Sequence, residues 1–260
     1  MSSGVQASID GPVARLVLDR PDSLNALNDE VRRGIVELLD ELEERPDVRV
    51  LVLTGAGRAF SAGADLRSTA YPEIAGDWST RRHRTGTWQR LLAQLDRLPQ
   101  ATVAGLHGHV IGGAALLAAA FDIRIATADT VVRIPELAIG IPLTWAGIPL
   151  LVREVGLPLT RDWVMTCRSV PADELLRSGY VQRLALAGEL DTALDECVDQ
   201  LLAVPPGPLA MTRAMTSAIG RSAPAMAAGW GDADHQQWAF TEDEYRSAVR
   251  DYLERMRGGR

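Results

Sequence analysis

The chain has 260 residues, of which 47% are hydrophobic, and this suits one large domain with a sizeable core. Its formal net charge of −7 at pH 7 lacks the basic surplus of nucleic-acid binders, so we expect no nucleic-acid partner. All 27 basic residues are arginine, which excludes Schiff-base lysines, pyridoxal-phosphate enzymes and lysine-containing phosphate loops.

The expected compartment is the cytoplasm. The two cysteines, Cys167 and Cys197, are too few for a disulfide scaffold and fit a reducing environment. The first ten residues lack the charged start and apolar run of a signal peptide. The longest apolar run, residues 114–121, is too short to span a bilayer, so we predict no membrane partner.

The N-terminal part of the chain predicts a hairpin, a helix and a buried strand. Residues 5–9 and 13–18 flank a turn with the sequence Asp-Gly-Pro and predict paired strands. Asn28 is a candidate cap for a helix whose apolar residues fall on one face, before a break at residues 45–47. Residues 48–53 form an apolar-rich run, typical of a strand buried on both faces.

The alternation of strands and helices continues further along the chain. We expect the polar segment 68–87 to be mobile or variable. After it the pattern predicts a helix over 88–98, a strand over 102–106, an apolar helix over 113–121 and two short strands over 123–126 and 131–134. Beyond residue 150 the pattern is mainly helical, with a Pro-rich connection over residues 201–208 and a last helix over about 241–256. This order favours an α/β fold with right-handed crossovers.

Two loops rich in small residues, residues 55–66 and 108–113, each follow a predicted strand. Small residues let backbone N–H groups approach a ligand closely. Two such loops can hold a carbonyl oxygen between two amide donors. They then stabilise the negative charge that the oxygen gains when the neighbouring carbon is deprotonated or attacked. The second loop opens a helix, whose dipole adds about half a positive charge at its start.

Other kinds of site have weaker support in the sequence. Gly55 and Gly57 begin a dinucleotide-type fingerprint, but Phe60 stands where the third glycine is required. His107 and His109 have no adjoining carboxylate or cysteine cluster, so we expect no metal site. No Gly-x-Ser-x-Gly elbow is present to supply a serine nucleophile.

Four segments resemble the enoyl-CoA hydratase/isomerase (crotonase) family. Residues 20–27, Arg-Pro-Asp-Ser-Leu-Asn-Ala-Leu, are similar to the family's Arg-Pro-x-x-x-Asn-Ala-Leu segment. Residues 62–66, Ala-Gly-Ala-Asp-Leu, are similar to its Ala-Gly-Ala-Asp-Leu/Ile loop. Residues 111–114 resemble its Gly-Gly-Gly/Ala turn, and residues 135–140 its Pro-Glu-x-x-x-Gly segment. The resemblance covers nearly the whole chain and is strongest from residue 20 to residue 147.

The resemblance implies an α/β crotonase (ClpP/crotonase-like) spiral of ββα units. Residues 1–200 would form the spiral core with the CoA-binding and oxyanion-hole loops, and residues 201–260 a helical C-terminal region for trimerisation. It also implies an acyl-CoA substrate, no cofactor apart from the CoA of that substrate, and a homotrimer or homohexamer.

The resemblance assigns roles to individual residues. The N–H groups of Ala64 and Gly113 would form the oxyanion hole, and Glu136 would be the catalytic acid/base. Burial raises the pKa of a carboxyl group toward neutrality, and the neighbouring Leu137, Ala138, Ile139 and Ile141 could supply an apolar pocket. The residues expected to bind the substrate or its CoA are Ala26, Ala62, Asp65, Leu66, Arg67 and Phe240.

Two departures from the family bear on the reaction. Hydratases of the family carry a second glutamate where this chain has Leu116, and dienoyl isomerases and dehalogenases carry an aspartate where it has Thr144. A single carboxylate suffices to move a double bond, so we favour conversion of 3-enoyl-CoA to 2-enoyl-CoA. Hydration of 2-enoyl-CoA and non-catalytic acyl-CoA binding remain the alternatives.

We expect four tryptophans to lie in the core or an interface: Trp145, Trp163, Trp230 and Trp238.

Overall fold

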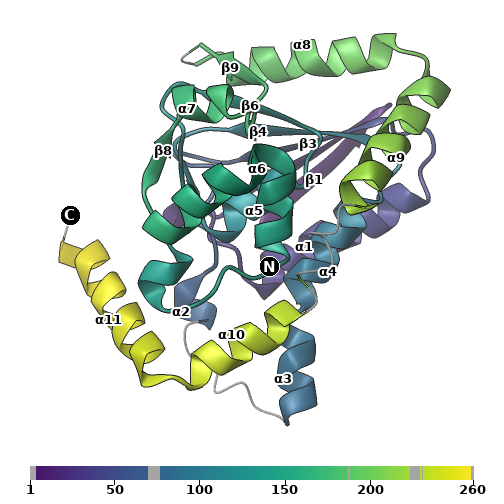
Figure 1. Cartoon of the computed structure of the whole chain (residues 1–260). Helices are drawn as coiled ribbons and strands as arrows, with labels where there is room; N and C mark the ends of the chain where they lie inside the picture. The colour runs from purple at the N-terminus through teal and green to yellow at the C-terminus, as the bar shows by residue number, and fades with distance from the viewer. Residues whose placement is uncertain (1–3, 70–76, 187, 223–228, 230, 259–260) are drawn as a thin grey trace.

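The strands of this protein form two sheets (Figure 1). The computed structural model describes residues 4–69, 77–186, 188–222, 229 and 231–258. The larger sheet has the order β1-β2-β3-β4-β6-β9, with strands Val5–Asp10, Val13–Leu18, Val50–Gly55, Ala101–Leu106, Ile123–Thr127 and Arg183–Ala185. The smaller sheet has the order β5-β7-β8, with strands His109–Ile111, Val131–Arg133 and Ser169–Pro171.

The predicted N-terminal hairpin and central strands are confirmed. β1 pairs antiparallel with β2, and from β2 onward the larger sheet is parallel. Every residue of β4 is buried, as expected for a parallel strand covered on both faces. The short β7 was predicted from its apolar run, but β5, β8 and β9, of three residues each, were not. Residues 109–111 of β5 were assigned to the second Gly-rich loop, and three residues show no readable alternation.

Helices cover both sheets and make up most of the chain beyond residue 140. Helices α1 to α11 span, in order, Asp29–Glu43, Leu66–Thr69, Trp78–Thr85, Thr87–Leu95, Gly113–Ala119, Gly147–Thr166, Ala172–Arg177, Leu190–Ala203, Pro206–Ser222, Asp232–Thr241 and Asp243–Gly258, with 3-10 turns η1 at Pro21–Ser23 and η2 at Glu136–Ile139. As predicted, Asn28 caps α1, and its side chain accepts a hydrogen bond from the backbone N–H of Val31 at 2.9 Å.

Two segments differ from the sequence-based expectation. The polar segment 68–87 carries the end of α2 and all of α3, and its residues 70–76 lie outside the described part of the chain. The Pro-rich connection expected over 201–208 is much shorter, because α8 continues to Ala203 and α9 begins at Pro206, where proline is tolerated in a first helical turn.

The apolar helix α5 lies in the centre of the core, and all seven of its residues are buried. The buried Arg124 and the half-buried Arg153 satisfy its carbonyl end. The guanidinium of Arg124 donates to the carbonyls of Ala119 and Phe121 at 3.3 and 2.6 Å, and that of Arg153 donates to Ala119 at 3.2 Å. Arg124 also forms an ion pair with Glu154 at 2.5 Å. The opposite end of α5, at Gly113, points toward the predicted site.

The C-terminal helices pack back onto their own chain. Figure 1 shows α8 along the larger sheet at the top of the view, and α10 and α11 in yellow at the bottom, near α2 and α3. α11 packs on η2 through a cluster formed by Ile139, Tyr245 and Val249. The division near residue 200 stays a prediction, and that residue lies within α8.

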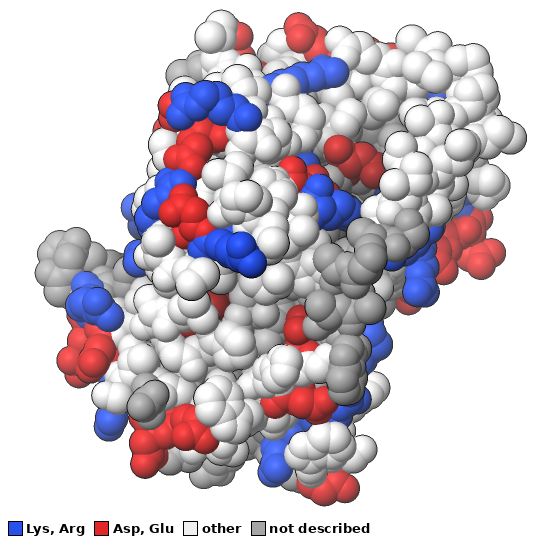
Figure 2. All heavy atoms as spheres, in the orientation of Figure 1, with Lys and Arg blue, Asp and Glu red and all other residues white. Residues whose placement is uncertain are grey.

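The surface of α9 carries an exposed apolar row, Met211, Met215 and Ile219, at four-residue spacing and 67–70% exposed. Figure 2 shows few charged atoms at the upper right, where α9 lies, whereas arginine and acidic side chains intermingle along the left edge. Within the described residues, no helix is long and apolar enough to cross a membrane.

Candidate active site

Asn25 ties the first predicted binding segment to the first Gly-rich loop. Its side chain, 1% exposed, donates to the carbonyls of Ala56 and Ala59 at 2.7 and 2.8 Å and accepts from the backbone N–H of Arg20 at 2.9 Å. The backbone carbonyl of Asn25 accepts a hydrogen bond from the Ser61 hydroxyl at 2.8 Å. The sequence motif includes Asn25, but its scaffolding role depends on contacts between distant segments and was not predicted.

Asp65 holds the same two segments together from the other side. Its carboxylate forms an ion pair with Arg20 at 2.9 Å and accepts the backbone N–H of Arg67 at 3.2 Å. Arg20 also donates to the carbonyl of Ala26 at 2.6 Å. The carboxylate of Asp65, predicted to bind CoA, therefore fixes the shape of the loop that carries Ala64.

The two Gly-rich loops meet where the predicted amide donors lie. Leu27 donates to the carbonyl of Gly63 and accepts from the N–H of Asp65, so the N–H of Ala64, between them, points away from Leu27. Gly63 has a φ of +80°, and a Cβ there would clash with the carbonyl oxygen of Ile111 and lie 3.5 Å from the nitrogen of Gly113. Within the described residues, neither Ala64 nor Gly113 gives its N–H to an acceptor.

Glu136 places its carboxyl group beside the second loop. Its Oε1 lies 2.5 Å from where a Cβ of Gly112 would be, so only glycine leaves room for the carboxyl group here. Its Oε2 is buried and has no hydrogen-bond partner among the described residues. Burial raises the pKa of Glu136 to about 7. A carboxyl group with this pKa can both accept and donate a proton near neutral pH.

The source of this burial differs in part from the prediction. Ile139 is buried and Ile141 half-buried, as expected, but Leu137 is 44% exposed and Ala138 is also exposed. The 3-10 turn η2 directs these two side chains away from the carboxyl group, because successive residues in a turn face different directions. Contact with Gly112 contributes to the enclosure instead.

The raised pKa of Glu136 predicts a pH-dependent stability. The pKa of the Glu136 carboxyl group is 4.5 in the unfolded chain and about 7 in the folded protein, so the folded state binds more protons between these pH values. Stability contributed by the protonated group is therefore present below pH 4.5 and lost as pH rises through about 7. Relative to Glu136→Gln, the wild type should lose about 2 kcal/mol between pH 5.5 and pH 8.5. Urea unfolding of both proteins at the two pH values measures this, and parallel pH dependences would contradict it.

The remaining predicted site residues lie around these loops. Ala26 is buried, Ala62 is half-buried, and Arg67 is exposed on α2. Leu66 and Phe240 both pack against the Ile139, Tyr245 and Val249 cluster, which joins the first loop, the Glu136 turn and the C-terminal helices.

The position of the missing second acid is filled by packing. Leu116 is 1% exposed, and its side chain would contact any Cβ added to Gly147.

Tyr252 of α11 was not predicted to belong to the site. Burial raises the pKa of its hydroxyl, Arg133 lowers it and Glu136 raises it further, so Tyr252 is within electrostatic range of both groups.

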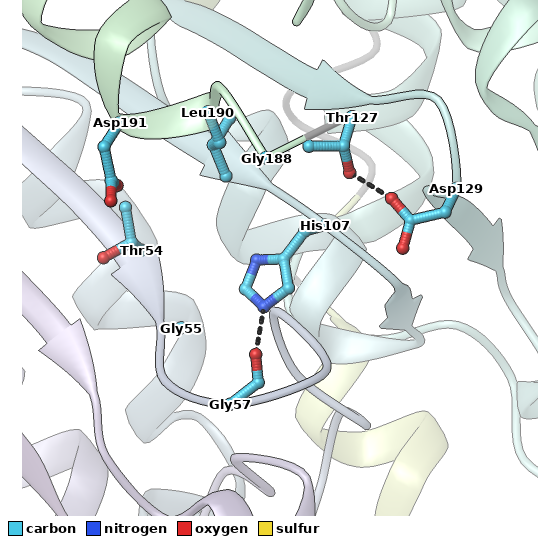
Figure 3. A pocket seen from close by; sticks show the side chains of 9 residues that line it. All are labelled: Thr54, Gly55, Gly57, His107, Thr127, Asp129, Gly188, Leu190 and Asp191. Atoms are coloured by element: carbon cyan, nitrogen blue, oxygen red, sulfur yellow. Dashed lines mark hydrogen bonds between the residues drawn. The ribbon is translucent and has the colours of Figure 1, made fainter. Parts of the chain in front are cut away.

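A separate cavity of about 450 Å³ lies at the carboxyl ends of β3, β4 and β6, and contains none of the predicted site residues (Figure 3). His107 lines this cavity. Its Nε2 atom lies 3.0 Å from the carbonyl oxygen of Gly57, and because that oxygen can only accept, Nε2 is the donor. The Nδ1 atom of His107 is buried and has no partner in the described part of the chain. The lining residues are Thr54, Gly55, Gly57, His107, Thr127, Asp129, Gly188, Leu190 and Asp191.

Comparison with known proteins shows the family to which this chain belongs. A family model described as enoyl-CoA hydratase/isomerase matches residues 8–258. A probable enoyl-CoA hydratase of Mycobacterium bovis is 33% identical over 183 residues, 70% of this chain and 69% of that protein. A mitochondrial Δ(3,5)-Δ(2,4)-dienoyl-CoA isomerase of Mus musculus is 31% identical over 180 residues, 66% of this chain and 55% of that protein.

A solved structure supports the same relationship. A putative enoyl-CoA hydratase from Thermobifida fusca, in complex with acetoacetyl-CoA, is 29% identical and has a TM-score of 0.76. The alignment covers 91% of this chain and 95% of that one. With its crotonase fold and a family match from residue 8 to residue 258, this chain is an enzyme of the enoyl-CoA hydratase/isomerase family.

Proposed function

We propose that this enzyme converts 3-enoyl-CoA thioesters to 2-enoyl-CoA thioesters, with Glu136 as the only proton carrier. The observation that carries the proposal is the buried Oε2 atom of Glu136, which has no hydrogen-bond partner among the described residues. Beside it stands the buried apolar Leu116, at the position where hydratases of the family carry a second glutamate. The bound acetoacetyl-CoA of the Thermobifida fusca relative supports an acyl-CoA ligand for this chain.

In the proposed reaction the thioester oxygen accepts hydrogen bonds from the N–H groups of Ala64 and Gly113. The carboxylate of Glu136 removes a proton from C2, and the electron pair moves into a dienolate whose negative charge rests on that oxygen. The protonated Glu136 then returns the proton at C4, which leaves the double bond between C2 and C3. A pKa of about 7 suits both half-reactions, because the same group must act first as a base and then as an acid.

Hydration is the second candidate, because the Mycobacterium bovis and Thermobifida fusca relatives are named as hydratases. Addition of water to 2-enoyl-CoA needs a group that holds and activates water opposite Glu136. The side chain of Leu116 can neither donate nor accept a hydrogen bond, and loss of general acid–base assistance lowers a rate by about 10²- to 10⁴-fold. Dienoyl isomerisation, the reaction named for the mouse relative, has less support, because Thr144 carries a hydroxyl that donates to Gln236 at 3.3 Å instead of a carboxylate.

The purified protein should therefore isomerise 3-enoyl-CoA at least ten times faster than it hydrates 2-enoyl-CoA, since the lost acid assists only the addition of water. Both rates are measured on the same preparation, by the rise and the fall of the absorbance of the conjugated thioester. Fast addition of water without isomerisation would establish the hydratase alternative. Inactivity toward a broad acyl-CoA panel, despite tight CoA binding, would establish non-catalytic binding.

Three further expectations accompany this proposal. They are a homotrimer or homohexamer, a cytoplasmic location, and no cofactor other than the CoA of the substrate. The exposed apolar row on α9, formed by Met211, Met215 and Ile219, is a surface that such an assembly could bury.

A further inference from the structure

The indole of Trp145 lies directly against the second Gly-rich loop and is stacked on the indole of Trp88. The rings of Trp88 and Trp145 have centroids 4.7 Å apart and an interplanar angle of 12°. The ring edge of Trp145 covers Gly113, and its Cη2 lies 2.6 Å from where a Cβ of that glycine would be. Trp88 and Trp145 are 7% and 8% exposed. The sequence predicted Trp145 for the core or an interface, and the structure seats it beside the predicted amide donor.

The backbone of this segment is held in an unusual conformation. Trp145 and Ala146 have φ values of +62° and +57°, and bulky side chains rarely adopt this left-handed region. The N–H of Ala146 donates to the carboxylate of Asp232 at 2.6 Å, and Asp232 is itself buried at the start of α10. Strained backbone persists only where its surroundings fix it, and such positions cluster at functional sites. The indole of Trp145 is therefore a fixed surface.

Glu136 and Trp145 cover consecutive residues of the same loop. The carboxyl group of Glu136 occupies the side-chain position of Gly112, and the indole of Trp145 occupies that of Gly113. In the proposed reaction the thioester oxygen lies at the N–H of Gly113 and C2 faces Glu136. Carbons beyond C4 that continue past Gly113 would then meet the indole, whose edge lies over that residue.

We propose that Trp145, supported by Trp88, forms the end wall of the acyl pocket and restricts the enzyme to short-chain acyl-CoA thioesters. This inference rests on the proposed function, because it needs an acyl group at the amides of Ala64 and Gly113. It names the substrate class that the proposed reaction leaves open.

The first test measures the affinity of the wild-type protein for saturated thioesters, which have no double bond to move. Calorimetric titration with butyryl-, octanoyl- and dodecanoyl-CoA gives the affinity at each chain length. In an open apolar channel each buried methylene adds about fourfold to the affinity. We expect no gain from four to eight carbons. A steady rise to twelve carbons would overturn the proposal without any variant.

The second test removes the wall. In Trp145→Ala the octanoyl-to-butyryl affinity ratio should increase at least tenfold, because the extra carbons gain a place to be buried. Trp238→Ala is the matched control, since Trp238 is 62% exposed on α10 and its loss should leave the ratio unchanged. Trp145→Phe keeps an aromatic ring but shortens it, and should shift the ratio in the same direction by less.

The outcomes separate the two levels of the argument. If wild-type protein binds neither free CoA nor any thioester, the proposed function fails and the wall with it. If all proteins bind CoA and Trp145→Ala keeps the wild-type ratio, only the wall is refuted. Should Trp145→Ala lose its thermal unfolding transition, Trp145→Phe and the wild-type series still decide. Either an unchanged ratio in Trp145→Phe or a steady wild-type rise then refutes the wall.

Discussion

Replacement of Glu136 by glutamine should reduce the isomerase kcat by about 10²- to 10⁴-fold, and further if no other group substitutes as the proton carrier. Glutamine has nearly the same shape as glutamate. It therefore fits beside Gly112, where the absence of a Cβ leaves room for the side chain of residue 136. It has no proton to accept or return near pH 7. Binding of saturated acyl-CoA thioesters should remain within a few-fold of wild type, because the amides of Ala64 and Gly113 are unchanged.

The Glu136→Gln measurement needs both a rate and an affinity. Steady-state kinetics with 3-enoyl-CoA gives kcat, and titration with butyryl-CoA shows whether the pocket is intact. Glu136→Asp is the informative companion, since it keeps the carboxyl group but withdraws it by one methylene from the substrate. We expect partial activity in Glu136→Asp. An unchanged kcat in Glu136→Gln would remove Glu136 from the reaction.

Substitution of Gly63 by alanine should reduce kcat/KM by about 10²- to 10³-fold, the usual effect of losing one oxyanion donor. The added Cβ would collide with the carbonyl of Ile111 and lie 3.5 Å from the nitrogen of Gly113. The two loops must separate to relieve that collision, so the donors of Ala64 and Gly113 can no longer grip one oxygen. A change of rotamer cannot relieve the collision, because an alanine Cβ has no rotamers and the carbonyl group of Ile111 belongs to the backbone.

Gly179→Ala is a closely matched control for Gly63→Ala. The two glycines have φ values of +79° and +80°, so alanine at either position pays a similar backbone cost of about 1 kcal/mol. A Cβ on Gly179 meets nothing within 4 Å. Comparison of kcat/KM and of urea stability for the two variants isolates the effect of the loop contact. Equal kcat/KM values would show that the contact does not position the donors.

Periodicity in the sequence predicted those parts of the fold whose burial follows a regular pattern. The strands that became β1 to β4 and β6 carry runs of five or six residues, and α1 carries an apolar stripe with a capping asparagine. β5, β8 and β9 have three residues each and lack the apolar run that revealed the equally short β7, and α3 has no buried residue, so none of them has an apolar pattern to detect. Elements stabilised by contacts to distant segments leave little trace in a local pattern.

For the candidate site, the sequence identified the groups but not what holds them. The motifs identified Ala64, Gly113 and Glu136, and the structure brings their three segments together. The bonds of Asn25 to Ala56 and Ala59 and the seat of Trp145 on Gly113 join residues more than thirty positions apart. No spacing rule connects such residues, so a single sequence without coordinates could not reveal them.

The helix that begins at Gly113, α5, differs at its two ends in the hydrogen bonding of its backbone groups. At its carbonyl end, Arg124 and Arg153 are permanent parts of the protein. At its amide end, the described residues provide Gly113 with no acceptor. An N–H group in the first helical turn that has no cap lacks a hydrogen bond in the folded protein. The oxygen of a bound thioester would accept this hydrogen bond, so the substrate would act as the N-terminal cap of α5. Any gain in binding affinity from this hydrogen bond would then also stabilise the folded protein against unfolding.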